Sequence, residues 1–232
     1  MQILPRLILL RRSNVEYDRI YVHNVKYSWQ LESLKQILLY LQIPQDKMLF
    51  VDGDSVIQAT TLIVPSVPLI LLKSLCLPDW LVKELRTIFL NSDYFCDIKY
   101  DKIYVSRSKV QIRGLTNEDQ LIIWLQKLGF ATVHLEDLEP LQQAYLFHGA
   151  KVIIGVHGSG FANLIFTTPG CKIIEIDHRL DGIYQRSLFN WLANSMNCQY
   201  CPFYADSILE EFLDTDITLQ IEDFISYVQT VL

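Results

Sequence analysis

The sequence has no excess of basic charge, and this shortage excludes a class of partner. Its 20 lysines and arginines stand against 26 acidic residues among 232, which gives a formal net charge of −6 at pH 7. Such a chain lacks the broad basic field of a general nucleic-acid binder. We therefore expect no nucleic-acid partner, and any phosphate binding must be local.

Long apolar runs and a regular cysteine framework are also missing. The opening apolar stretch is interrupted by Pro5 and Arg6 and is too short for a signal sequence or a membrane span. The five cysteines are scattered and odd in number, which is typical of a reducing compartment. Cys198 and Cys201 have C-x-x-C spacing, but no second pair or nearby histidine completes a zinc site, so we expect structural packing. These features predict a cytoplasmic protein with no transmembrane span, which can lie at the periphery of a membrane.

The composition and the order of patterns indicate an α/β fold. Half of the residues are hydrophobic and 20% are charged, which favours a globular chain with buried strands. From about residue 78 onward, strand and helix patterns alternate with short connections, as in a doubly wound parallel sheet. Pro65 and Pro68 interrupt the pattern, so we expect a boundary near residues 65–78 that separates domains 1–75 and 76–232.

Periodicity and punctuation predict the individual elements. Thr116 is the expected N-cap of one helix, and Gly129 is expected to end that helix. Strands are expected at residues 20–25, 48–51, 61–64, 102–105, 131–135, 152–156, 171–176 and 199–203. Helices are expected at residues 29–41, 80–90, 120–128, 140–149, 161–166, 184–196 and 221–231.

Residues 151–176 form the stretch around which the chain is organised. Two apolar strands flank the turn His157-Gly158-Ser159-Gly160 and a short amphipathic stretch. Backbone N–H groups and the positive end of a helix converge at such a turn, which favours an anion, above all a phosphate. A Cβ at either glycine would obstruct a turn with φ > 0 or the close approach of a ligand. The turn matches neither a Walker loop nor G-x-G-x-x-G, so a plain connection remains the alternative.

A second candidate loop follows the strand at residues 102–105. Ser106 and Arg107 lie at its end and Arg113 follows, and a guanidinium fork suits a diphosphate bidentately. A solvated basic loop is the alternative. Glu118 either belongs to the following helix start or orients one of the two arginines.

Three further polar residues of the central stretch have both a functional and a structural interpretation. His157 either donates a hydrogen bond to a phosphate or leaving group, or is a satisfied structural histidine. Asn163 either turns inward to hold the loop or faces solvent. Glu175 either accepts hydrogen bonds from a ribose or caps a neighbouring helix.

Two acidic motifs invite a metal interpretation, although we expect no metal. Asp52-Gly53-Asp54 has the D-x-D spacing that can hold a divalent cation against a sugar diphosphate, and a simple turn is the alternative. Asp177-His178 has no third ligand at metal spacing.

A set of short motifs adds a resemblance to these inferences. The set lies mainly between residues 102 and 178 and comprises Tyr104-Val105-Ser106-Arg107, Arg113, Asn117-Glu118, Gly129-Phe130, Glu136-Asp137-Leu138, Ala150, His157-Gly158-Ser159-Gly160-Phe161-Ala162-Asn163, Phe166, Pro169-Gly170 and Ile174-Glu175-Ile176. In these motifs and in Leu4-Pro5-Arg6-Leu7, the chain resembles glycosyltransferase family 61. That group includes plant xylosyltransferases and arabinosyltransferases and bacterial capsule-type enzymes.

The resemblance implies a fold, a reaction and a set of donor-binding residues. The fold would be of the GT-B type, with Rossmann-like parallel sheets in an incomplete acceptor-side domain (1–75) and a nucleotide-sugar domain (76–232). The reaction would be an inverting, metal-independent transfer from a nucleotide sugar such as a UDP-sugar to a hydroxyl of a glycan or polysaccharide, with no cofactor. The implied donor-binding residues are Ser106, Arg107, Arg113, Glu118, His157, Gly158, Ser159, Gly160, Asn163 and Glu175, and no catalytic base is assigned.

The sequence departs from the family pattern in two ways. The commonest family loop is H-G-A-G-L, whereas Ser159 and Phe161 stand here. The family's Leu-Pro-Arg-Leu usually follows a segment with a His-Trp pair, whereas here it begins at Leu4. The chain is therefore expected to be amino-terminally short, and a non-catalytic relative that binds a nucleotide or a partner protein is the alternative.

Overall fold

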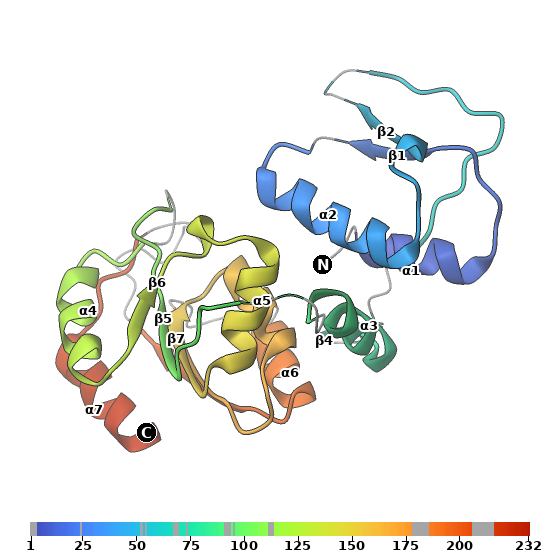
Figure 1. Cartoon of the computed structure of the whole chain (residues 1–232). Helices are drawn as coiled ribbons and strands as arrows, with labels where there is room; N and C mark the ends of the chain where they lie inside the picture. The colour runs from blue at the N-terminus through green and yellow to red at the C-terminus, as the bar shows by residue number, and fades with distance from the viewer. Residues whose placement is uncertain are drawn as a thin grey trace. The chain divides into compact units, whose positions relative to one another are not determined.

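The structure is a computed structural model of the whole chain (Figure 1). It describes residues 4–23, 25–51, 53, 55–66, 70–72, 74–90, 94, 96–110, 114–177, 186–205 and 216–232. Four predicted candidates lie outside these residues, namely Asp52, Asp54, Arg113 and His178. The chain divides into two compact units, one of residues 1–70 and 77–91 and the other of residues 71–76 and 92–232.

The first unit is built around one parallel strand pair and its connecting helix. Strands β1 (Ile20–His23) and β2 (Met48–Val51) pair in parallel, and α2 (Ser28–Leu41) joins them through the short 3-10 turn η1 (Gln45–Lys47). The apolar spacing of α2 buries Leu34, Ile37 and Leu38. Helices α1 (Leu4–Ser13) and α3 (Asp79–Phe89) both contact α2. Helix α3 therefore groups with the residues that precede the predicted boundary.

The second unit contains a five-stranded parallel sheet in the order β6-β5-β7-β8-β9. Its strands are β5 (Lys102–Val105), β6 (Ala131–Val133), β7 (Val152–Val156), β8 (Lys172–Asp177) and β9 (Gln199–Tyr204). The order reverses at β5, since β6 lies on one side of it and β7 on the other. This sheet confirms the predicted α/β class.

Helices cover both faces of this sheet, with α4 and α7 on one face and α5 and α6 on the other (Figure 1). They are α4 (Glu118–Lys127), α5 (Pro140–Gly149), α6 (Arg186–Ser195) and α7 (Ile221–Val231). Two 3-10 segments, η2 (Leu135–Asp137) and η3 (Ser159–Phe166), complete the connections. The expected short helix at residues 161–166 thus begins at Ser159 and is a 3-10 helix.

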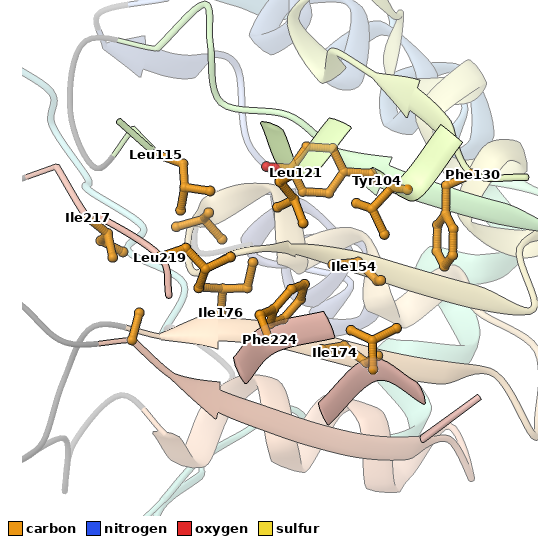
Figure 2. Close-up of a cluster of buried hydrophobic side chains, with 14 of the residues drawn as sticks. Tyr104, Leu115, Leu121, Phe130, Ile154, Ile174, Ile176, Ile217, Leu219 and Phe224 are labelled. Carbon is orange, nitrogen blue, oxygen red and sulfur yellow. The ribbon is translucent and has the colours of Figure 1, made fainter. Parts of the chain in front are cut away.

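Alternate residues of the central strands form the core under α4 and α7 (Figure 2). Ile154 of β7 and Ile174 of β8 pack with Leu121 of α4 and Phe224 of α7, and all four are fully buried. Because successive strand residues face opposite sides, the residues between them face α5, η3 and α6. The short apolar runs of β7 and β8 therefore reflect a sheet buried on both faces.

Two local predictions were wrong, namely the strand at residues 61–64 and the N-cap at Thr116. The expected linker contains two short paired strands, β3 (Ile70–Leu72) and β4 (Ser74–Cys76), whereas residues 61–64 form no strand. Thr116 is not the N-cap of α4: its hydroxyl pairs with Thr218 at 2.7 Å, and Asn117 occupies the cap position. Gly129 does end that region, at φ +80°, as expected.

The core assignment predicts that two substitutions on α4 differ sharply. Leu121 is fully buried and Ile123 is 57% exposed. Leu121→Ala should lower the free energy of unfolding by about 2–5 kcal/mol through lost transfer energy and a cavity. Ile123→Ala should change it by less than about 0.5 kcal/mol. Urea denaturation of both variants measures the difference, and equal losses would contradict the assignment.

Candidate functional site

The two predicted loops meet where the strand order reverses. Ser106 and Arg107 follow β5, and His157 and Gly158 follow its neighbour β7, so both loops leave the same edge of the sheet. The N–H of Ser106 donates to Val133 of β6 at 2.9 Å, and the N–H of His157 donates to Ile176 of β8 at 2.8 Å. The loops therefore start from fixed positions. Open α/β sheets bind ligands at this point, outside the carboxyl ends of the strands.

The guanidinium of Arg107 lies directly against the backbone of Gly158. A Cβ at position 158 would collide with Nη1 of Arg107 and would lie 3.2 Å from its Cζ. Gly158 has φ 172°, which is extended backbone that any residue adopts, so the expected φ > 0 turn is wrong. The glycine is required instead by a close approach, and the approaching group is Arg107. At Gly160, a Cβ would lie 2.7 Å from Leu135.

Glu118 holds the Arg107 loop from the buried side. Its Oε1 accepts the backbone N–H of Arg107 at 3.1 Å and the hydroxyl of Tyr104 at 2.7 Å. The carboxylate is 5% exposed, and burial together with this charge raises the pKa of Tyr104, so the hydroxyl remains a donor. Both interpretations of Glu118 describe the structure, since it is the first residue of α4 and its carboxylate accepts the backbone N–H of Arg107.

The other polar side chains of the first loop bind one another or the segment that follows β6. Ser106 is buried, and its Oγ accepts the backbone N–H of Ser108 at 3.2 Å. Ser108 in turn pairs with Nε2 of His134 at 3.2 Å. Lys109 forms an exposed ion pair with Asp137 of η2 and lowers the pKa of that carboxyl. These contacts fasten the loop after β5 to the segment after β6.

His157 and Glu175 form a buried pair behind the second loop. Nδ1 of His157 lies 2.5 Å from Oε1 of Glu175, and Glu175 is 1% exposed. The hydroxyl of Tyr200 on β9 donates to Oε2 of the same carboxylate. Both oxygens of Glu175 therefore have hydrogen-bond partners inside the protein, and the expected ribose contact stays a prediction. Tyr200 was missed because an aromatic residue on a short strand carries no sequence signal.

Asn163 turns inward, and Ser159 faces outward. The side-chain amide of Asn163 donates to the Gly160 carbonyl at 3.1 Å and to Gln143 of α5 at 2.9 Å. This is the loop-holding alternative for Asn163. Ser159 is exposed beside it, at the first residue of η3. The structure thus brings Arg107, Gly158 and the start of η3 to one edge, with Glu118, Glu175 and Asn163 as internal supports.

The cysteines near this sheet have structural surroundings. Cys198 is buried, and its Sγ lies 3.3 Å from the hydroxyl of Thr167. A hydrogen bond with Cys198 raises the pKa of Cys171. The predicted packing role of Cys198 is consistent with these contacts. Within the part of the chain that the structure describes, no group of three or more His, Cys, Asp or Glu side chains has a metal-binding arrangement, and no helix is long and apolar enough to cross a membrane.

Comparison with known proteins identifies the family. The family model described as Glycosyltransferase 61 matches residues 1–174. The chain belongs to glycosyltransferase family 61. The xylan glycosyltransferase MUCI21 of Arabidopsis thaliana is 35% identical to it over 75 residues, a stretch that covers 30% of this chain and 15% of that protein. The matched stretch is thus a small part of the relative's length.

The family 61 match covers only part of the network described above. Arg107, Glu118 and the loop at residues 157–160 lie within residues 1–174. Glu175 and Tyr200 lie beyond the last matched residue. The hydrogen bonds that Glu175 and Tyr200 make behind His157 are therefore taken from the structure of this chain.

Close packing at the site predicts a contrast between two glycines. A Cβ on Gly155 of β7 would lie 2.9 Å from the Phe161 ring, 3.1 Å from Val105 Cβ and 3.3 Å from the Val105 carbonyl oxygen. Gly155→Ala should therefore lower the free energy of unfolding by about 1–3 kcal/mol through overpacking. Gly149→Ala, where nothing lies within 4 Å, should be neutral or slightly stabilising. Thermal unfolding measures both, and a neutral Gly155→Ala would contradict the packing of η3 against β5 and β7.

Proposed function

We propose that this family 61 chain transfers a sugar from a nucleotide-diphosphate donor to a hydroxyl group of a glycan. The observation that carries the proposal is the contact of the Arg107 guanidinium with Gly158 at the reversal of strand order. Through this contact the planar guanidinium lies beside the backbone of Gly158, which directly precedes η3. Backbone N–H groups at a helix start and an arginine fork both favour a diphosphate.

The proposed chemistry is an inverting, metal-independent transfer. The acceptor oxygen attacks the anomeric carbon of the donor sugar while the bond from that carbon to the phosphate oxygen breaks. The departing nucleoside diphosphate gains negative charge, and the Arg107 guanidinium together with backbone N–H groups stabilises it. The acceptor proton passes to a general base that remains unassigned.

Several finer points of the proposal come from the family and from the sequence. We infer a GT-B arrangement, with the second unit binding the donor and the first unit serving the acceptor. The printed name of the plant relative refers to xylan, which supports a polysaccharide as the acceptor class. A UDP-sugar as donor and a location in the cytoplasm remain predictions.

Binding calorimetry with UDP and GDP tests the donor site. Wild-type chain should bind one of them equally well with and without chelator. Arg107→Ala should lose at least about tenfold in affinity, since a charge-assisted bond is worth roughly 1.5–3 kcal/mol. Arg107→Lys should rescue this only in part, because an ammonium cannot bind bidentately.

Lys109→Ala is the matched control for this experiment. It removes a positive charge from the same loop, but Lys109 is exposed and already paired with Asp137. Its affinity should stay within about threefold of wild type, as expected for a screened surface charge. Failure of the folded wild-type chain to bind any nucleotide would overturn the proposal. If nucleotide binds, the release of UDP from a UDP-sugar in the presence of a glycan acceptor distinguishes turnover from binding alone.

A further inference from the structure

A buried chain of three polar side chains runs behind the second loop, from His157 through Glu175 to Tyr200. They come from three consecutive strands, since His157 follows β7, Glu175 lies on β8 and Tyr200 lies on β9. Glu175 is 1% exposed, and each of its carboxylate oxygens has a hydrogen-bond partner. A buried carboxylate is costly unless it is fully satisfied, so this arrangement constrains its partners strongly.

The positions of the protons in this row of three side chains follow from Tyr200, which lies at one end of it. Burial, followed by the charge of Glu175, raises the pKa of Tyr200, so its hydroxyl keeps its proton and donates it to Oε2. An ionised carboxylate only accepts hydrogen bonds. At Oε1 the donor must therefore be Nδ1–H of His157. The tautomer of His157 is thus set by Glu175 on the neighbouring strand β8, which is itself held by Tyr200 on β9.

The ring plane of His157 is fixed as well. The Phe189 ring of α6 packs against the imidazole with the centroids 5.2 Å apart and the planes tilted by 58°. With Nδ1 held on Glu175, Nε2 is the remaining ring nitrogen of a residue that is 5% exposed. The next residue along the chain is Gly158, which contacts Arg107. The imidazole therefore stands immediately beside the proposed diphosphate site.

We propose that Glu175 and Tyr200 are positioning residues, which hold His157 with Nδ1 protonated so that the bare Nε2 accepts a hydrogen bond from a hydroxyl group of the nucleotide donor, beside its diphosphate. The arrangement follows the general logic by which a carboxylate fixes the tautomer and orientation of a functional histidine. This inference rests on the proposed function for the ligand, but the tautomer of His157 stands independently of it. Neither positioning residue lies within the family match.

Nitrogen NMR of the ligand-free chain tests the network directly. Long-range proton–nitrogen correlations distinguish the two tautomers, and the His157→Asn variant identifies the signals of position 157. We expect a proton on Nδ1 of His157 in the wild-type chain. A bare Nδ1 with the proton on Nε2 would overturn the positioning network, whether or not the chain binds nucleotide.

Calorimetry with UDP then tests the functional role. Tyr200→Phe should weaken UDP binding by about tenfold, and Glu175→Gln by more, in the range of roughly 10–100-fold typical of groups that orient a functional histidine. Tyr227→Phe is the matched control: its hydroxyl donates to the Pro202 carbonyl at 3.1 Å, and its ring packs with the core on the opposite face. Tyr200→Phe should lose more thermal stability than Tyr227→Phe, because it leaves one oxygen of a buried carboxylate without its donor.

The outcomes separate the two proposals. Unchanged UDP affinity in Tyr200→Phe and Glu175→Gln, with wild-type binding intact, would reduce the network to a structural role and overturn the inference. A wild-type chain that binds no nucleotide would overturn the proposed function and with it the role of Nε2. Loss of affinity in Tyr227→Phe equal to that in Tyr200→Phe would show a general effect of stability and would also overturn the inference.

Discussion

The parallel pairing of β5 with both β6 and β7 is the constraint on which the site depends. The sheet extends on both sides of β5, so the chain leaves β5 and β7 toward opposite faces of the sheet. The two loops therefore begin side by side at the same edge of the sheet. Gly155 lets η3 pack against β7, and Gly158 lets the Arg107 guanidinium approach the backbone. Without these two close approaches, the loops would still be neighbours, but the cation would not reach the start of η3.

Much of this arrangement can be predicted from the sequence. The apolar runs at residues 152–156 and 172–177 are buried on both faces, and such runs between turns are the strongest signal for parallel strands. Helices α5 and α7 begin and end at the expected residues because Pro140, Gly149 and a clear apolar period mark them. The two candidate loops can be singled out because Arg107 and His157 follow directly after strands, and their role in donor binding stays a prediction.

What could not be predicted depends on contacts between distant residues. Asn117 displaces Thr116 as the cap because its amide pairs with Leu219, about a hundred residues further along the chain. The reason for Gly158 is a side chain from another loop and not a local turn. One partner of Glu175 is the phenol of Tyr200 on β9, which no sequence signal indicates. In each case the residue can be singled out from the sequence, but its contacts depend on the tertiary structure.

The central claim is that the loops after β5 and β7 form the donor site, and chemical-shift mapping tests it most directly. Backbone amide spectra of labelled chain would be followed during titration with UDP. We expect the largest shifts at residues 106–109 and 157–161, on both loops together. Two other hollows, one beneath α2 and one beside the start of α7, offer a contrast. Shifts confined to either hollow, or to the first unit, would contradict the claim.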